Sequence, residues 1–298
     1  MLRLIARRLL LAIPMLLGVS AVTFILVALT PGDPAVSILG SNATQAQDAA
    51  LDRQLGFDQP VLVQYWHWLA NALHGDLGTS LLSSQSVTSQ LNARLPVTLS
   101  LVICATIVSA VLGIALGTIS AVRGGVTGKL VDVLAMLGFA IPGFWLGLVL
   151  VELFAVRVRL LPATGYVSLT ASPGGWLQSM ILPTATLAIG GMTAIAKQTR
   201  DGMLDALGRE YVDALRADGI SEARIIIRHA LKNAGIPVLT TIGTFFIGML
   251  GGTILVESVF ALPGLGSLAV LNHRARPADD PGSGHLFLPR RGDRQPDR

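Results

Sequence analysis

The chain has 298 residues, of which 52% are hydrophobic and 13% are charged, and its formal net charge is +4 at pH 7. Soluble globular domains normally carry charge on about a quarter of their residues, so the composition excludes a soluble globule and indicates a membrane protein. The positive charge does not indicate a nucleic-acid partner, because the basic residues lie at the ends of apolar runs and not on one continuous patch.

Five apolar runs are long enough to cross the hydrocarbon core as helices, which takes about 20 residues each. They are residues 9–29, 97–119, 131–154, 176–196 and 236–256. The first run is longer than the roughly 7 to 15 residues of a signal-peptide core, so we expect it to be kept as a span. The single cysteine, Cys104, lies in the second run and excludes an intrachain disulfide. The runs predict an all-α, polytopic membrane protein.

Positively charged residues are distributed unevenly among the segments between these runs. With the N terminus inside, the inner segments hold twelve Lys or Arg and the outer segments hold four. Inner loops of membrane proteins carry the excess of Lys and Arg. The sequence therefore predicts a cytoplasmic N terminus, a large outer segment at residues 30–96 and a cytoplasmic loop at residues 197–235.

Aromatic residues gather in the outer segment, where Tyr65, Trp66 and Trp68 lie close together. Such amphipathic rings are typical of the boundary between lipid headgroups and hydrocarbon. His67 and His74 stand seven residues apart without a nearby Cys or carboxylate pair. We therefore expect them to be surface histidines and not metal ligands.

The predicted spans carry small-residue pairs and clusters, at Gly113 and Gly117, at Gly143 and Gly147, and at Gly243, Gly248, Gly251 and Gly252. Small residues let helix backbones approach closely in lipid, so these positions predict tight packing. The alternative is that such helices bend or slide during transport. Pro142 predicts a kink in the third span, because proline removes a backbone hydrogen bond.

The spans have no ionisable residue near their centres, which disfavours a transporter driven by protons or sodium. We expect the charges near the span ends to reach water, namely those of Asp132, Glu152, Lys197 and Glu257. "GGVTGKL" at 124–130 differs from a phosphate loop, because one residue is missing between its glycines and Leu130 replaces Ser or Thr. We therefore expect no enzymatic activity and no cofactor in this chain.

The predicted cytoplasmic loop is densely charged, with seven basic and six acidic residues between positions 197 and 232. Apolar residues from Met203 to Leu215 recur at helical spacing and predict an amphipathic helix. Gly219 suits a left-handed helix end, and Ser221 is placed to cap a second helix that extends to about Asn233. One interpretation is a helix resting on the inner leaflet, but the balanced charges favour docking into the groove of a partner.

The stretch "EYVDALRADGISEARIIIRHALKNAGIPVLT" resembles the cytoplasmic loop of permeases of the dipeptide and oligopeptide ABC importer family, which docks on a partner ATPase. The likeness continues in order over residues 1–272, in "LTPGDPA", "LDRQLGFDQPVLVQYWHWL", "HGDLGTSL", "RLPVTLSL", "IPGFWLGLVL", "LLPATGY" and "VESVFALPGLG". So many ordered blocks make chance a poor explanation. The resemblance implies a type I ABC importer permease domain over residues 1–272.

The resemblance also implies partners in the bacterial inner membrane and on both sides of it. These are a second permease subunit, two cytoplasmic ATPase subunits or domains, and an extracytoplasmic peptide-binding protein. Asp213, Ala214 and Leu215 stand where the general permease pattern has Glu-Ala-Ala, and Asp218 stands where this subfamily often has Lys. The docking hypothesis assigns ATPase coupling to Gly219, Ile220, Ser221, Arg224 and Arg228, with Glu210 and Arg216 bracing the preceding helix.

The family pattern has a sixth span after "VESVFALPGLG", but residues 273–298 hold six Arg, four acidic residues and four Pro. This composition predicts a disordered tail that does not span the membrane. A shifted reading frame near residue 272 is a hypothesis for the change of character.

The sequence therefore predicts the permease subunit of an ATP-driven importer of dipeptides or oligopeptides. The alternatives are an importer of nickel or another small solute of the same family, a transporter that works alone, and a membrane scaffold without transport activity. The residues that line the substrate path leave no recognisable pattern in the sequence.

Overall fold

The computed structural model describes residues 2–29, 46–47, 50, 53, 56–80, 83 and 85–274. Within them the secondary structure is helical, apart from one isolated antiparallel bridge between Thr79 and Ser86. The predicted all-α class is confirmed. The chain divides into two compact units, of which the first contains α1 (Leu2–Ala28) and α4 (Val61–Leu73), and the second contains residues 76–79 and 85–271.

In the first unit, α1 and α4 meet through a small polar and aromatic contact. The hydroxyl oxygens of Ser20 and Tyr65 lie 2.9 Å apart, and the ring of Tyr65 meets Phe24 edge-on with the ring centroids 5.6 Å apart. Trp68 stacks on Tyr65, whereas Trp66 is exposed. The predicted aromatic group is therefore divided, because neighbouring residues on a helix point to different sides.

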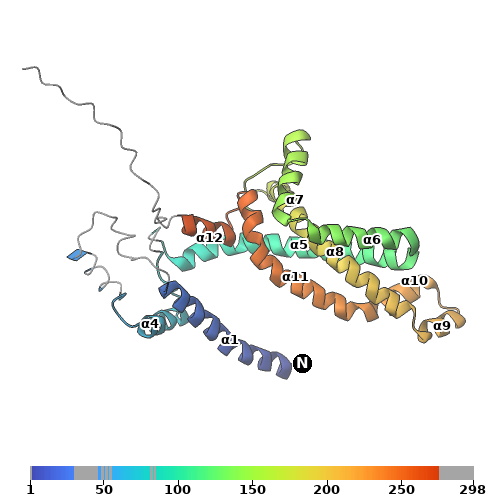
Figure 1. Cartoon of the computed structure of the whole chain (residues 1–298), viewed down its shortest axis with the longest axis horizontal. Coiled ribbons are helices and arrows are strands. Elements are labelled where there is room, and N and C mark those ends of the chain that lie inside the picture. The colour runs from blue at the N-terminus through green and yellow to red at the C-terminus, as the bar shows by residue number, and fades with distance from the viewer. Residues whose placement is uncertain are drawn as a thin grey trace, which may run out of the picture. The chain divides into compact units, whose positions relative to one another are not determined.

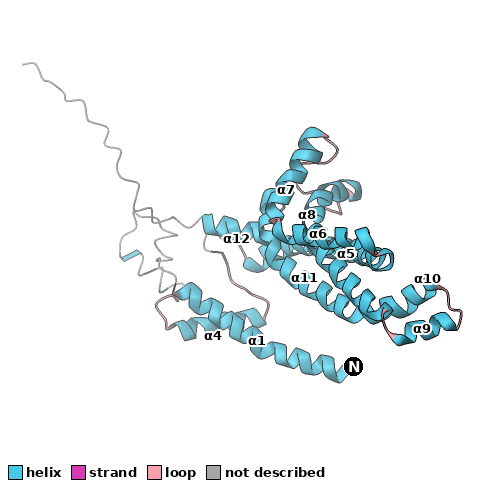
Figure 2. Ribbon diagram, turned by 45° about the vertical axis from the view of Figure 1, so that its right-hand side comes forward, coloured by secondary structure: helices cyan, strands magenta, loops and turns pink. Residues whose placement is uncertain are grey.

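Three long helices form the centre of the second unit (Figure 1), namely α5 (Val87–Arg123), α8 (Pro173–Leu207) and a continuous helix from Glu222 to Val259. The continuous helix consists of α10 (Glu222–Arg224), the π-helical turn η2 (Ile225–Ala230) and α11 (Leu231–Val259). Figure 2 shows α5, α8 and α11 packed side by side. These helices and α1 are the four in the described part of the chain that are long and apolar enough to cross a membrane.

The third predicted span is interrupted at Pro142 and not merely kinked. α6 (Gly125–Ala140) ends before Ile141, whose backbone is extended with φ −84° and ψ 121°, and α7 (Gly143–Leu150) then begins and leads into the π-helical η1 (Val151–Arg157). α6 and α7 run in different directions (Figure 1). The predicted disturbance at Pro142 is therefore larger than a kink, because proline disfavours helical geometry in the residue before it and has no N–H of its own.

The glycines differ in whether this chain uses them for close packing. A Cβ on Gly113 would lie 2.8 Å from the Cβ of Ile195, and a Cβ on Gly117 would lie 2.6 Å from the Cβ of Thr199. The predicted tight packing is confirmed for this pair, which lets α5 cross α8 closely. It is wrong within the described chain for the α11 cluster, where no atom lies within 4 Å of an added Cβ at Gly243, Gly248, Gly251 or Gly252.

Charged residues near the span ends also divide into two groups. Asp132 on α6 pairs with Lys197 and Arg200 on α8, each at 3.4 Å, and Glu152 pairs with Arg157 at 3.0 Å. The side chains of Asp132, Lys197 and Glu152 are partly exposed, as predicted. Glu257 is 0% exposed, so the prediction that it reaches water was wrong.

The described part of the chain ends with α12 (Leu265–Arg274), a helix of ten residues. Residues 275–298 lie outside the described residues, as do residues 30–45, which include most of "LTPGDPA". The predictions of a disordered tail and of a shifted reading frame therefore stay predictions.

Candidate functional site

The charged loop forms a helix–glycine–helix element, residues 210–230, at the ends of α8 and α11. α8 ends at Leu207, Arg209 is extended, and α9 (Glu210–Ala217) then begins. The prediction of one amphipathic helix from Met203 to Leu215 was wrong, because the chain breaks at Gly208 and leaves Met203 buried on α8. Only the second half of the predicted helix lies on α9.

Gly219 ends α9 in the left-handed geometry predicted from the sequence, with φ +77°. The Gly219 N–H donates to the Arg216 carbonyl at 3.0 Å, and the Ile220 N–H donates to the Leu215 carbonyl at 3.1 Å. This pair of bonds is the Schellman motif, which satisfies carbonyls that a helix end would otherwise leave without partners. The glycine therefore sets the direction in which the second helix leaves.

Ser221 occupies the N-cap position of the second helix, as predicted, but its side chain makes no capping hydrogen bond within the described residues. Its carbonyl instead accepts the N–H groups of Arg224 and Ile225. The predicted end of this helix near Asn233 was wrong, because the helix continues through Pro237 to Val259. Proline inside a membrane helix is tolerated where neighbouring structure compensates for the missing bond.

The helix–glycine–helix element is anchored to the ends of three long helices. Val212 and Ile225 are fully buried, and Ala230 packs in one cluster with Ala121 of α5 and Met203 of α8. The Asn233 amide donates to the Tyr211 hydroxyl at 2.8 Å, which ties α9 to α11. A force applied to this element therefore reaches α5, α8 and α11 through packed side chains.

The outer face of the element presents the residues that the sequence singled out. Ile220 is half-buried, and the other eight predicted coupling residues are exposed, namely Glu210, Asp213, Ala214, Arg216, Gly219, Ser221, Arg224 and Arg228. Its exposed charges are mixed, with Arg216, Arg224 and Arg228 against Glu210, Asp213, Asp218 and Glu222, and the exposed Arg209 directly precedes the element. A face of mixed charge matches a protein surface better than an anionic lipid surface, which favours an excess of basic residues.

Arg216 joins the two helices of the element. Its guanidinium donates to Glu222 at 2.7 Å and to Asp213 at 3.1 Å. The hydrogen bond to Glu222, followed by that to Asp213, raises the pKa of Arg216 above its ordinary value. The two ion pairs of Arg216 are consistent with the predicted bracing role, and Glu222 is a partner that the sequence analysis missed. The side chain of Glu210, the other predicted bracing residue, makes no ion pair or hydrogen bond within the described residues.

We expect Arg216→Ala to loosen the joint between α9 and α10, because both bonds of the guanidinium fork are lost. Amide hydrogen exchange at Gly219 and Ile220 should become faster, and Arg216→Lys should give an intermediate rate, since lysine keeps the charge but not the fork. Arg224→Ala is the matched control, because Arg224 is exposed on the same element without an ion pair in the described structure. Equal exchange rates in Arg216→Ala and Arg224→Ala would contradict the bracing role.

Ile227 is a second residue that the sequence analysis missed as part of the site. The three consecutive isoleucines face different sides, so that Ile225 is buried, Ile226 is half-buried and Ile227 is 68% exposed. An exposed apolar side chain among arginines suits the centre of a protein interface, which is depleted of most charged residues but enriched in arginine. Helical periodicity could have placed Ile227 opposite Ile225, but only the packing shows which of the two faces inward.

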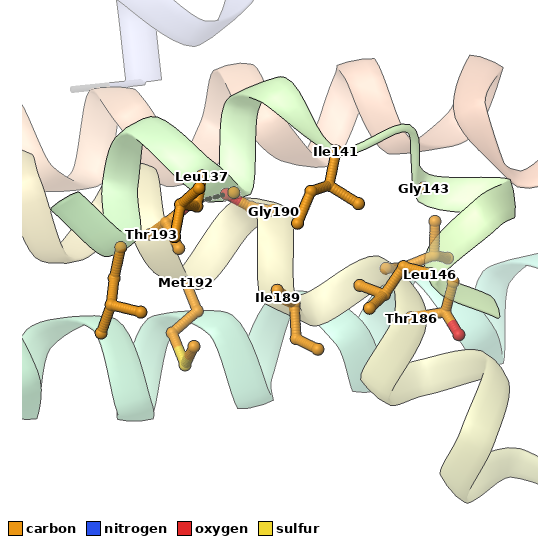
Figure 3. A pocket seen from close by; sticks show the side chains of 12 residues that line it. Leu137, Ile141, Gly143, Leu146, Thr186, Ile189, Gly190, Met192 and Thr193 are labelled. Carbon is orange, nitrogen blue, oxygen red and sulfur yellow. Dashed lines mark hydrogen bonds between the residues drawn. The ribbon is translucent and has the colours of Figure 1, made fainter. Parts of the chain in front are cut away.

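A cavity of about 360 Å³ lies where α6, α7 and α8 meet around the break at Pro142 (Figure 3). Its walls are mainly apolar, with Leu137 and Ile141 on one side and Ile189 on the other. The hydroxyls of Thr186 and Thr193 already donate to backbone carbonyls of α8. The described residues that line the cavity thus offer apolar surface and carry no charged group.

Two family models match nearly the whole described chain. The model for the binding-protein-dependent transport system inner membrane component matches residues 113–277. The model for the N-terminal part of the membrane component of such systems matches residues 1–102. The chain belongs to this permease family. Its fold class and its nature as a multi-pass membrane protein agree with the prediction from the sequence.

Bacterial relatives cover most of this permease. A putative peptide transport system permease protein of Brucella abortus is 41% identical over 90% of this chain and 85% of its own length. A probable peptide ABC transporter permease protein of Sinorhizobium fredii is 38% identical over 89% of this chain and 85% of its own. A glutathione transport system permease protein of Salmonella typhimurium is 40% identical over 91% of this chain and 86% of its own length.

Proposed function

We propose that this permease is the membrane-spanning subunit of an ATP-driven importer of dipeptides or oligopeptides in the bacterial inner membrane. The observation that carries the proposal is the helix–glycine–helix element, whose exposed face has mixed charge and whose buried face is packed on three long helices. Membership of the permease family supports the same function. The names of relatives that handle peptides or glutathione favour a peptide substrate over nickel.

The energy for transport comes from partner subunits in this proposal. ATP binds to two cytoplasmic ATPase subunits or domains, and the permease itself holds no cofactor and no ATPase site. "GGVTGKL" supports this view, because Gly124 caps α5 and the following residues open α6, whereas a phosphate loop follows a strand. A second permease subunit and an extracytoplasmic peptide-binding protein complete the complex.

The orientation follows from the positive-inside rule. The N terminus and the helix–glycine–helix element face the cytoplasm, and residues 30–96 face outward. The proposed coupling residues are Glu210, Asp213, Ala214, Arg216, Gly219, Ile220, Ser221, Arg224 and Arg228.

The experiment that tests the function is copurification from bacterial membranes followed by uptake of a labelled dipeptide and of nickel into proteoliposomes. Uptake of nickel alone would favour the small-solute alternative, and absence of a copurified ATPase would favour a transporter that works alone.

We expect Ile227→Ser to weaken copurification of the ATPase about tenfold or more. Truncating a residue that is buried at the centre of an interface can cost about 2 kcal/mol or more of binding free energy. The measured quantity is the molar ratio of ATPase to permease after affinity purification. Val126→Ser is the matched control, because Val126 is 83% exposed but lies on α6, outside the helix–glycine–helix element. An equal loss in both variants would contradict a role of Ile227 as an anchor.

A further inference from the structure

Glu257 is a buried carboxylate that the proposed function does not yet use. It lies two residues before the end of α11, at the end opposite the helix–glycine–helix element, and is 0% exposed. A carboxylate at such a place is costly unless its oxygens accept hydrogen bonds. The partners that satisfy it therefore indicate what it holds in place.

Both carboxylate oxygens of Glu257 accept hydrogen bonds from other parts of the unit. Thr98 on α5 donates its hydroxyl to Oε1 at 2.6 Å. The N–H groups of Gly266 and Ser267, at the start of α12, donate to Oε2 at 2.7 and 3.2 Å. The Leu265 N–H donates to the Thr98 hydroxyl oxygen at 2.9 Å, which closes the network. Glu257 thus joins α5, α11 and α12 at one point.

The surrounding backbone is shaped to fit this carboxylate. An added Cβ on Gly264 would overlap the Glu257 carboxyl group, and one on Gly266 would overlap the backbone of Ile254. Ala261 has a left-handed backbone with φ +51°, although it carries a side chain. Non-glycine residues keep such a conformation only where the surrounding structure enforces it. The turn from α11 to α12 is therefore held by its contacts and not by local preference.

The helix that carries Glu257 also carries the second half of the helix–glycine–helix element. It runs without a break from Glu222 to Val259, and 38 residues at about 1.5 Å each give a length of about 57 Å. The hydrocarbon core is about 30 Å thick, so one helix reaches from the proposed docking surface to the opposite end of the bundle. A displacement of its docking end is thereby transmitted to Glu257.

We propose that the Glu222–Val259 helix is the mechanical link of the importer and that Glu257 is the positioning residue through which this helix moves α5 and α12. The proposal rests on the proposed function, because the displacement comes from a docked ATPase. Without the carboxylate, the helix moves but α5 and α12 no longer follow it. ATP hydrolysis then continues while import of peptide fails.

The test uses the complete importer in proteoliposomes and measures ATP hydrolysed and dipeptide imported in the same sample. Glu257→Gln should leave ATP hydrolysis unchanged and lower the peptide imported per ATP about tenfold, the size expected when hydrogen bonds to a charged group are lost. Thr98→Val should act in the same direction, and Thr98→Ser, which keeps the hydroxyl, should restore the ratio. Glu152→Gln is the matched control, because Glu152 is an exposed glutamate paired with Arg157 at a helix end.

A measurement at the site itself distinguishes a loss of coupling from a loss of the fold. Amide exchange at Gly266 and Ser267 should rise about tenfold in Glu257→Gln while exchange in the middle of α8 stays unchanged. If Glu257→Gln does not insert, Thr98→Val still tests the link, because it keeps the carboxylate and both backbone donors. An unchanged ratio of peptide imported to ATP hydrolysed in Glu257→Gln and Thr98→Val would contradict the proposed mechanical link. An equal fall of ATP hydrolysis and peptide import in these variants would also contradict it. Failure of the unmodified importer to hydrolyse ATP or import peptide counts against the proposed function itself.

Discussion

Replacing Gly219 by proline is expected to abolish peptide uptake while leaving the permease inserted in the membrane. Proline requires φ near −65°, whereas Gly219 has φ +77°, and proline also removes the N–H that donates to the Arg216 carbonyl. Proline at a position whose native φ it cannot adopt, and whose N–H was hydrogen-bonded, costs more than about 1 kcal/mol, and this cost falls on the joint that directs α10. The measurements are uptake into proteoliposomes, permease content of the membrane, and the ratio of copurified ATPase to permease.

Two matched variants show whether the effect comes from backbone geometry. Gly219→Asn should keep most uptake, because asparagine tolerates the left-handed conformation better than other residues with side chains. Gly208→Ala should also keep uptake, since Gly208 has φ −83° and an added Cβ would meet, among the described residues, only the Leu204 carbonyl at 3.4 Å. Normal uptake by Gly219→Pro would contradict the proposal that this element couples the permease to the ATPase.

Replacing Gly117 by valine is expected to destabilise the second unit and to lower its melting temperature. A Cβ at this position would overlap the Ala196 carbonyl and lie 2.6 Å from the Cβ of Thr199, both on the central helix α8. Overpacking of a well-packed core costs about 1–3 kcal/mol and occasionally more. Here backbone faces backbone across the helix crossing, so α5 can only accommodate the side chain by moving away from α8. The measurement is thermal stability of the purified permease in detergent.

Gly243→Val is the control for this prediction. It makes the same change in a helix of the same unit, but in the described chain an added Cβ at Gly243 meets no atom within 4 Å apart from the backbone of its own helix. We expect its stability to stay within about 0.5 kcal/mol of the unmodified chain, as for a surface substitution. Equal melting temperatures for Gly117→Val and Gly243→Val would show that the α5–α8 crossing does not depend on the small residue.

The helix–glycine–helix element was predictable because its signals are local. Gly219 and the position of Ser221 are recognisable from residue type, since the conformational freedom of glycine and the preference of serine for helix starts depend on neighbouring residues only. The same local signals gave wrong boundaries at Gly208 and Pro237. A break or a continuation there is decided by what packs against the helix, which residue type does not reveal.

Glu257 shows that the position of a charged residue in an apolar run does not reveal whether its side chain is buried. It follows a valine near the end of an apolar run, as Glu152 does, and both were expected to reach water. Glu152 is exposed and Glu257 is fully buried. The difference lies in Thr98, which is 159 positions away in the chain and becomes a neighbour only when α5 packs on α11.

The sequence by itself determined the all-helical class, the membrane location, the permease family and the charged helix–glycine–helix element, because each depends on composition, on periodicity or on a short ordered motif. The tertiary structure decided which glycines are covered, which isoleucine faces outward, that the third span is interrupted, and that one helix joins the helix–glycine–helix element to a buried carboxylate. These features depend on which side of each helix meets a neighbour. That choice is made by residues far apart in the chain, whose contacts arise only when the helices pack.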